Sequence, residues 1–472
     1  MQDLVSDNNS MAPTAAPPVS TGSTAVHILG LVLAFLLLVA TAPPLVLLVI
    51  RPFNIVNLSF AILLFVVAVD YGILWAVGRS LDKKYQRIVD SSFQQGSAKP
   101  SAPRNLTRAY GLTLVCLLPF LIYLFVFAIY CVEVLITEVL VLSDAINGMP
   151  LFVLIGLGIV ALGTLWGVAI GIWRLFVPAK RKEIGVPLAP DHDLRLKALV
   201  DEVAADSGTR SVEQVRLVPD ASVAVWEDGG LIRVLTGRGR RKMQIGLSAV
   251  HDMTVPELKS ILRHEFAHFS NRDTAWGTFT FSMTRSLLTA WQATPGGNPL
   301  RARGVTAIVV CLNPAWWVYW LYVRLYFRAT NGFSRFRELM ADWDAITYAG
   351  GECFASGLTK VVVNGEAFRA WRLSAEVPKG EVPRVAEAIG TSLTGMTPEQ
   401  LAEMRKAALS PTPKKASVYR THPETETRLA YANRAGGENR SACSDEPVRA
   451  LFDDWDTSDD AVSHAWLGAP AA

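Results

Sequence analysis

Long uncharged apolar runs dominate the first 180 residues of the chain. A helix needs about 20 apolar residues to cross the hydrocarbon core of a bilayer. Four runs approach or exceed that length: Ile28–Ile50, Phe53–Gly78, Gly111–Val132 and Leu151–Trp173. Four buried core helices of this length in so short a stretch would be unusual. We therefore predict a membrane domain over residues 25–178 with four transmembrane helices.

The charges between these runs predict an orientation. The segment Arg79–Arg108 carries seven Lys and Arg residues, whereas Glu133–Pro150 carries three acids and no base. Four more basic residues follow the fourth run between Arg174 and Lys182. Since Lys and Arg stay on the cytoplasmic side of a membrane, we expect both the amino terminus and everything after Arg174 to start on that side.

Beyond residue 184 the pattern changes to that of a mixed domain. Asp191–Asp206 is amphipathic, and four short β-rich runs follow at Gln214–Val218, Ser222–Trp226, Leu231–Thr236 and Met243–Leu247. A helix begins at Thr254, with Glu257 at the capping-box position. Further helical patterns lie around Ser334–Tyr348, Pro398–Leu409 and Pro423–Arg434. The fold class expected is α+β: a multi-pass helical membrane domain plus a mainly helical domain with a small β-sheet.

The second domain is expected to span residues 184–435, interrupted by two apolar segments at 274–293 and 304–327. The first contains Arg285, and the second has Asn313-Pro314 in its middle, so neither is a clean transmembrane run. Residues 1–24 are rich in Ser, Thr, Ala and Pro and are expected to be disordered. Residues 436–472 are expected to form a flexible acidic tail.

Composition supports a membrane protein and narrows its partners. Hydrophobic residues make up 51% of the chain and charged residues 18%, against about a quarter charged in soluble domains. The net charge of +3 is close to neutral, and no phosphate-binding glycine loop or basic stripe is present, so nucleic acid is not an expected partner. The five cysteines include no CxxC pair, which favours free thiols and a reducing compartment.

The stretch RHEFAHF, Arg263–Phe269, carries the clearest chemistry. Positions i and i+4 share a helix face, so His264 and His268 can both direct a ring nitrogen at one metal ion. Glu265 lies beside them, where it could take a proton from a metal-bound water. A solvated helix would be the alternative, but Phe266 and its apolar neighbours indicate a buried helix, in which histidines need partners.

A catalytic zinc site needs a third protein ligand. In the segment Ser334–Asp342, Glu338 and Asp342 are four apart and share a helix face. One of them could bind the metal, and the other could hold the free N–H of a ligand histidine. Asp344 points elsewhere and is expected to be solvated. Without the histidine pair, this segment would be read as a surface helix with acid–base pairs.

Three motifs together resemble a known family. HEFAH is followed about 70 residues later by SRFRELMAD and near the end by THPETETR. This order resembles the HtpX-like and CaaX prenyl endopeptidase membrane zinc metalloproteases, and the resemblance covers roughly Asp191 to Arg434. It implies a zincin-type catalytic domain with one zinc ion per chain, bound by His264, His268 and Glu338.

The same resemblance assigns further roles. Glu265 is implied as the general base and Asp342 as the acid that supports a ligand histidine. His422 and Arg428 match the late His-Pro…Arg element, which is implied to lie near the active site and to help stabilise the transition state. On charge alone, His422 could donate to a developing oxyanion, although it could equally be a histidine at the start of a helix.

The chain departs from the family pattern at the strand before the catalytic helix, which reads Ala221–Trp226. The resemblance implies that this strand binds substrate backbone by strand addition, and the different residues here leave its side-chain specificity unassigned. Topology adds a condition, because Glu338 and the histidines must lie on one side of the membrane. Thr274–Ala293 and Val305–Val323 must therefore either both cross or both not cross, and the resemblance implies a hairpin of two spans.

These observations predict a multi-pass zinc metalloendopeptidase of the cell membrane, hydrolysing peptide bonds of membrane or membrane-near proteins at the cytoplasmic face. Its partners would be a protein or peptide substrate and the lipid bilayer. The alternative is a non-enzymatic metal-binding scaffold or regulator, but such a protein has no use for Glu265. A transporter would need inverted repeats and several charged spans, and Asp70 is weak support for that.

Overall fold

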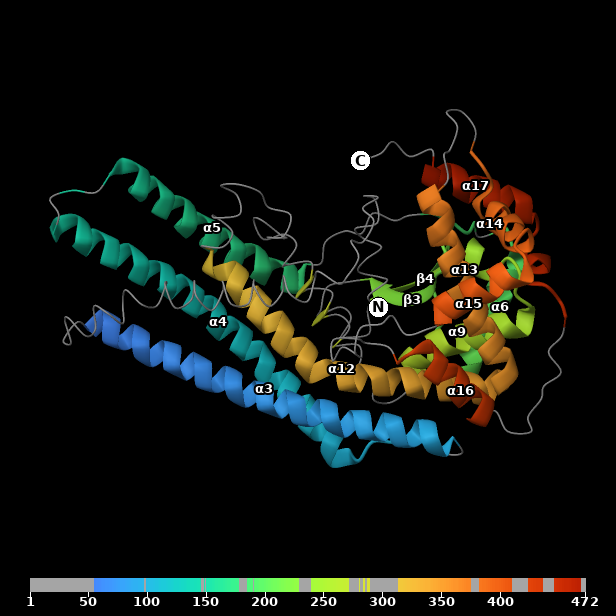
Figure 1. Cartoon of the computed structure of the whole chain (residues 1–472), viewed down its shortest axis with the longest axis horizontal. Coiled ribbons are helices and arrows are strands. Elements are labelled where there is room, and N and C mark those ends of the chain that lie inside the picture. Colours follow the sequence, from blue (N-terminus) through green and yellow to red (C-terminus); the bar gives the residue numbers. More distant parts are fainter. Residues whose placement is uncertain are drawn as a thin grey trace.

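The computed structural model shows a long helical part joined at one end to a rounded domain (Figure 1). It describes residues 55–96, 99–145, 148, 150–177, 185–189, 191–228, 239–270, 280, 283–284, 287–288, 313–374, 382–409, 423–435 and 445–467. Within the rounded domain, helices surround a small sheet. One helix, α12, runs from the long part into the rounded domain and connects the two.

Three long helices form most of the elongated part: α3 (Ile55–Gln95), α4 (Arg104–Ala145) and α5 (Leu151–Phe176). Within the described residues, each is long and apolar enough to cross a membrane. Their outer faces carry large exposed apolar side chains, such as Phe65, Leu112 and Phe152. Three of the four expected spans are therefore present as membrane-length helices, and Ile28–Ile50 lies outside the described residues.

Helix α12 (Pro314–Ala349) is longer than the sequence pattern indicates. The side chain of Asn313 caps its start by accepting a hydrogen bond from the backbone of Ala315 at 3.0 Å, and Pro314 occupies the first turn. Asn313-Pro314 thus begins a helix rather than interrupting one. The apolar end of the segment 304–327 and the charged pattern Ser334–Tyr348 belong to this single element. Most of 271–312 lies outside the described residues, so the expected hairpin stays a prediction.

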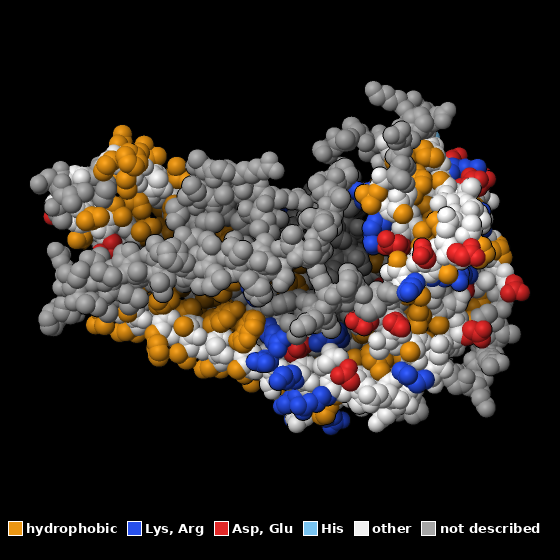
Figure 2. Space-filling model, viewed as in Figure 1, with side chains coloured by type: hydrophobic (Ala, Val, Ile, Leu, Met, Phe, Trp, Pro, Cys, Tyr) orange, Lys and Arg blue, Asp and Glu red, His pale blue; other side chains and the backbone are white. Residues whose placement is uncertain are grey.

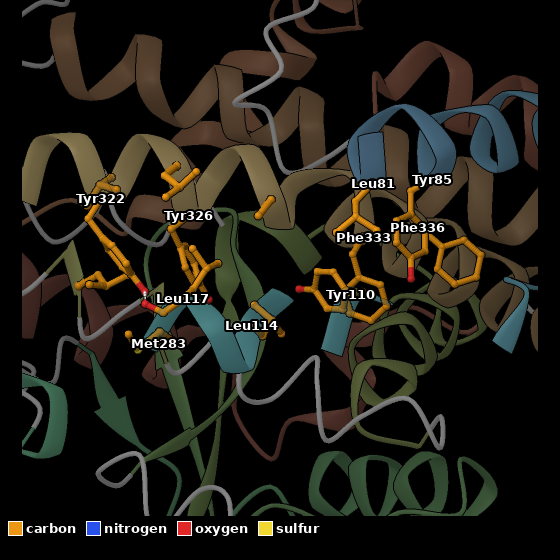
Figure 3. Close-up of a cluster of buried hydrophobic side chains, with 14 of the residues drawn as sticks. Leu81, Tyr85, Tyr110, Leu114, Leu117, Met283, Tyr322, Tyr326, Phe333 and Phe336 are labelled. Carbon is orange, nitrogen blue, oxygen red and sulfur yellow. Dashed lines mark hydrogen bonds between the residues drawn. The ribbon is translucent and has the colours of Figure 1, made fainter. Parts of the chain in front are cut away.

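An aromatic core fixes α12 against α3 and α4 (Figure 3). The rings of Tyr110 and Phe333 stack with centroids 4.2 Å apart, and Tyr85 meets Phe333 edge-on at 5.4 Å. Further along α12, the hydroxyl of Tyr322 donates to the backbone oxygen of Leu117 at 2.9 Å. Because these side chains are fully buried and their positions are specified by ring contacts and a hydrogen bond, α12 has little freedom to slide.

The closest approach of α3 and α12 combines a glycine with buried charges. A Cβ at Gly332 would lie 2.8 Å from the Cα of Asp82, so only glycine permits this contact. The Asp82 carboxylate accepts from Arg335 at 2.5 Å and lies 3.4 Å from Arg328. We call these four residues the α3–α12 joint. It ties a membrane-length helix to the helix that enters the rounded domain.

The sheet has four strands: β1 (Val186–Pro187), β2 (Gln214–Val218), β3 (Val223–Asp228) and β4 (Arg240–Gly246). Their order is β1-β2-β4-β3, with β2 and β4 parallel and the other two pairs antiparallel. Three of the predicted strands match β2, β3 and β4 closely, and Leu231–Thr236 lies outside the described residues. Among the described strands β3 is at the edge, with only β4 beside it.

Helices cover the sheet and build a second core. The helices of this domain are α6 (Leu194–Asp206), α8 (Leu247–Val250), α9 (Val255–Ser270), α13 (Gly351–Ser374), α14 (Val385–Thr394), α15 (Pro398–Leu409) and α16 (Thr425–Ala435). Of these, α6, α8, α9 and α14 bury side chains in the second core together with the sheet. The capping residue Glu257 of α9 behaves as expected, since its carboxylate accepts from the backbone of Thr254 at 2.7 Å. Helix α13 was not expected from the pattern. Its buried Cys353 is disulfide-bonded, so the prediction of free thiols is wrong for this residue.

The expectation of a flexible tail is wrong for residues 445–467, which form η2 (Val448–Leu451) and α17 (Trp455–Leu467). The backbone nitrogen of Val255, at the start of α9, donates to Glu446 at 2.8 Å, and Asp459 accepts from the backbone of Glu387 in α14 at 3.0 Å. The reason is local amphipathicity. Among the acids, Trp455 and Val462 are spaced to face the core, and both are buried.

Candidate metal centre

Helices α9 and α12 bring three metal-ligating side chains together. Nε2 of His264 lies 3.5 Å from one carboxylate oxygen of Glu338, and Nε2 of His268 lies 3.5 Å from the other. The two imidazole rings meet nearly at right angles, 5.0 Å apart. All three ligand atoms lie within 4.8 Å of one another. The two histidines and the glutamate, predicted from separate motifs, therefore point at one position.

This geometry fits a zinc ion. A tetrahedral site with metal–ligand distances of about 2.0–2.1 Å has ligand atoms about 3.3–3.4 Å apart. One carboxylate oxygen of Glu338 is 3.5 Å from Nε2 of His264 and the other is 3.5 Å from Nε2 of His268, close to that value. Two imidazoles and one carboxylate are also the chemistry of a catalytic zinc site with an open fourth position. Glu338 would be the metal ligand, and Asp342, the other acid of the pair, would not bind the metal directly.

Asp342 supports the histidine from behind. Its Oδ1 lies 3.0 Å from Nδ1 of His264, on the side of the ring away from Glu338. Burial raises the pKa of Asp342, but the adjacent Arg428 and His264 outweigh this and hold it below its ordinary value. A fully buried carboxylate is thus kept ionised, and it fixes the orientation of the ligand ring.

Arg428 from α16 holds Asp342 through a two-point contact. Its Nε and Nη2 donate to the two carboxylate oxygens at 2.8 and 2.6 Å. Burial lowers the pKa of Arg428, but the Asp342 carboxylate outweighs this and raises it above its ordinary value. Arg428, Asp342 and His264 form a continuous buried chain that leads from α16 to the candidate metal position. Arg428 can therefore help to orient His264 through its contact with Asp342.

The charge balance among the side chains of the site also favours a cation. Burial lowers the pKa of His264, but hydrogen bonds to Asp342 and Glu338 outweigh it and raise the pKa to about 10. In other words, the two carboxylates favour a positive charge at this ring. A divalent cation bound to Nε2 would replace the proton there and satisfy the same carboxylates.

Glu265 is placed beside the ligands without being one of them. Burial raises the pKa of Glu265 to about 7; His264 and the backbone N–H of Val225 in β3 act in the opposite direction, and Glu338 adds to the increase. This glutamate therefore lies between the ligand set and the edge strand of the sheet. A carboxylate with a pKa near neutrality is suited to accept and return a proton.

Two contacts in the site escaped the sequence reasoning. The ring of Phe354, from α13, stacks on His264 with centroids 6.1 Å apart, and the guanidinium carbon of Arg428 lies 5.9 Å from the centroid of the Phe354 ring. Arg337 donates to the backbone oxygen of His268 at 2.9 Å, at the end of α9. Phe354 has no motif that signals it. Arg337 stands inside SRFRELMAD, directly before Glu338, and its positive charge is of the kind that interacts with a helix C-terminus.

Two further residues singled out in the sequence are His422 and Asp344. His422 lies outside the described residues, so its role stays a prediction. Asp344 is not solvated as expected: its side chain is only 14% exposed and lies 3.5 Å from the amino group of Lys99. The segment between α3 and α4 thus reaches the catalytic helix α12, which explains why this acid is covered.

The helix with HExxH and the glutamate from a second helix form a group that could hold a metal ion, as in the class of metallopeptidases. Comparison with known families agrees. Residues 216–435 match the family model of Peptidase family M48, so this part of the chain is a domain of that family. This confirms the resemblance drawn from the three motifs. No curated protein and no solved structure matches the chain.

The family match has clear limits within the structure. It begins in β2 and ends with α16, and so includes α9, α12 and every described residue of the candidate site. It leaves out α3, α4 and α5, as well as the C-terminal segment 445–467. The peptidase domain is therefore a metallopeptidase by family, and the three membrane-length helices associate it with a membrane.

Proposed function

We propose that this protein is a membrane-embedded zinc endopeptidase that hydrolyses peptide bonds of membrane or membrane-near proteins at the cytoplasmic face. The observation that carries the proposal is the convergence of His264, His268 and Glu338, with 3.5 Å between the carboxylate oxygens and each ring nitrogen. Glu265 follows His264 on α9, interacts electrostatically with His264 and Glu338, and is not one of the three grouped side chains. One zinc ion per chain is expected.

The chain's own residues account for the remaining steps. When bound, zinc would polarise the scissile carbonyl and lower the pKa of a water molecule toward about 7. Glu265 would accept the proton of that water and later pass it to the leaving amine. Asp342 keeps His264 in the tautomer with a proton on Nδ1, so that Nε2 presents its lone pair.

Substrate binding is proposed at strand β3. Within the described part of the sheet its second edge has no strand beside it, and Val225 of β3 is next to Glu265. An extended peptide could add to this edge by main-chain hydrogen bonds, which would place a peptide bond near the metal position. His422 is proposed to donate a hydrogen bond to the oxyanion, so His422→Ala should lower kcat while the zinc content stays the same.

The proposed orientation rests on charge. The basic stretch Arg79–Arg108 and the peptidase domain lie at the same end of the long helices (Figure 1), and such stretches stay cytoplasmic. The disulfide at Cys353 stands against this orientation, because reducing compartments keep thiols reduced. Added trypsin decides the question: on sealed inverted vesicles it should cut the peptidase domain, and on right-side-out vesicles it should not.

The activity is tested by cleavage of an unfolded protein and by self-cleavage, using detergent-purified chain stripped of metal and then reloaded with zinc. Zinc should restore cutting in the wild type and not in Glu265→Gln. If zinc binds at one ion per chain but neither protein cuts any substrate, the scaffold alternative gains over the protease. That alternative would need a closed site with a fourth protein ligand, and the group found among the described residues has three.

A further inference from the structure

A group of basic side chains lies where the membrane-length helices leave their apolar zone. It consists of Arg79, Lys83, Lys84 and Arg87 of α3 and Arg104 and Arg108 of α4, and all six are exposed. We call this group the basic patch. The ring contact between Tyr85 and Tyr110, at 6.0 Å, holds the two helices together at this level. The patch is therefore one surface assembled from two helices.

The patch borders directly on the lipid-facing surface. On α3 the last large exposed apolar side chain is Val77, and Arg79 follows two residues later. On α4 the order is reversed, with Arg108 followed by the exposed Leu112. Figure 2 shows the same boundary, with Lys and Arg side chains gathered next to the end of the hydrophobic face along the lower edge. Both helices thus change from apolar to basic next to each other, as expected where transmembrane helices meet the headgroups.

The protein itself supplies little negative charge to this surface. Between Arg79 and Arg108 the acids are Asp82 and Asp90. Asp82 is buried and already shared by Arg335 and Arg328, and Asp90 is the one exposed acid beside six exposed bases. That buried group has two positive charges and one negative, so it cannot neutralise the patch from within. Lys99, in the same segment, differs because it pairs with Asp344, and we do not count it in the patch.

We propose that the basic patch is a binding surface for the headgroups of anionic phospholipids in the leaflet next to the peptidase domain. Lys and Arg beside an apolar transmembrane face attract acidic lipids, and each such side chain strengthens the attraction to the anionic membrane surface. Arg79 and Lys83 are one turn apart on the same exposed face of α3 and can share a phosphate. The proposal is independent of whether the protein cleaves peptides.

Lipid binding here would also bear on the peptidase domain. The helix face opposite the patch carries Leu81, Asp82 and Tyr85, which pack against α12. Headgroups bound to the patch would hold the emerging half of α3 at a fixed depth. Through the α3–α12 joint, they would hold α12, and with it Glu338, at a fixed height above the membrane.

The test uses the full chain in mild detergent and needs no enzyme activity. Equal amounts of phosphatidylglycerol and phosphatidylcholine are added, and the lipids retained are counted by intact-mass spectrometry. The wild type should retain phosphatidylglycerol in preference. The triple variant Lys83→Gln, Lys84→Gln, Arg87→Gln should lower that preference by on the order of 100-fold. The control removes three exposed charges far from the patch, by Lys197→Gln, Arg405→Gln and Lys406→Gln, and should keep it.

Three results would overturn the proposal. The first is an equal retention of the two lipids by the wild type. The second is an equal loss of preference in the patch and control variants, which would reduce the effect to net charge. The third is displacement of phosphatidylglycerol by inorganic phosphate at the same concentration, which would make the patch a site for a free anion. If the triple variant unfolds at the same temperature as the wild type, misfolding is excluded as the cause of a lost preference for phosphatidylglycerol.

Discussion

The membrane helices and the peptidase domain arrange polar and apolar side chains in opposite ways. On α5, the apolar side chains Leu151, Phe152 and Leu162 are 71%, 74% and 69% exposed. In the peptidase domain, the charged side chains Asp342 and Arg428 are 0% and 9% exposed. Lipid can cover the first set, whereas the second set must find partners inside the protein. Each half is therefore stable only with the surroundings that suit it.

Helix α12 belongs to both halves. Its first part packs aromatic side chains such as Tyr322 against α4, and its last part carries Glu338 and Asp342. The α3–α12 joint lies between these two parts. Substitutions should therefore cost most at buried charges, less at the joint and least at lipid-facing residues.

The largest effect is expected from Arg428→Ala in the peptidase domain. It leaves the buried carboxylate of Asp342 without its cation, which typically costs about 3–5 kcal/mol when one partner of a buried pair is removed. Zinc affinity should fall about 10–100-fold, because Asp342 would no longer hold His264 firmly. Thermal unfolding and chelator competition measure the two effects.

Arg405→Ala is the control for this change, since Arg405 is an exposed arginine on α15 and should be replaceable without effect on either measurement. Arg428→Lys should recover only part of both losses, because lysine cannot make the two-point contact. Wild-type zinc affinity in Arg428→Ala would show that the buried chain from Arg428 to His264 has no positioning role.

A smaller effect is expected at the joint. In Gly332→Ala the new methyl would lie 2.8 Å from the Cα of Asp82, and overpacking of this kind costs about 1–3 kcal/mol. Gly72→Ala on α3 is the control, because nothing lies within 4 Å of its Cβ position. Thermal unfolding in detergent compares the two variants. Equal stability would mean that α3 and α12 can separate at the joint without loss.

The smallest effect is expected at the lipid-facing surface. Leu162→Ala should change the free energy of unfolding by no more than about 0.5 kcal/mol, as at other surface positions. Leu117→Ala on α4 makes the same change at a side chain that is 1% exposed, and should cost about 2–5 kcal/mol. Equal losses at the two positions would place Leu162 in a protein contact instead of in lipid, and would weaken the contrast between the two halves.

The sequence predicts those parts of the molecule that depend on local pattern. The capped start of α9 and the spacing of His264 and His268 need only a helix, and both are present. The pair Glu338 and Asp342 was found by its i, i+4 spacing, but spacing alone left open which acid binds the metal. The structure supports Glu338, because it faces Nε2 of both histidines, while Asp342 faces Nδ1 of His264.

Other parts depend on tertiary contacts that no local pattern reveals. The two halves of α12 look like separate elements because one faces aromatic neighbours and the other faces a polar site. Phe354 is an ordinary apolar residue until α13 folds back onto His264. Trp455 and Val462 belong to an acidic segment. They are buried because they pack into the same core as α14 and the sheet.

The most direct test of the account measures zinc per chain and cleavage on the same preparations of three proteins. The wild type should hold one zinc ion and cut an unfolded substrate. Glu265→Gln should hold one zinc ion and lose activity by about 10²–10⁴-fold. Glu338→Gln should lose both zinc and activity. Cleavage at the wild-type rate by Glu265→Gln, or full zinc occupancy in Glu338→Gln, would contradict the assignment of base and third ligand.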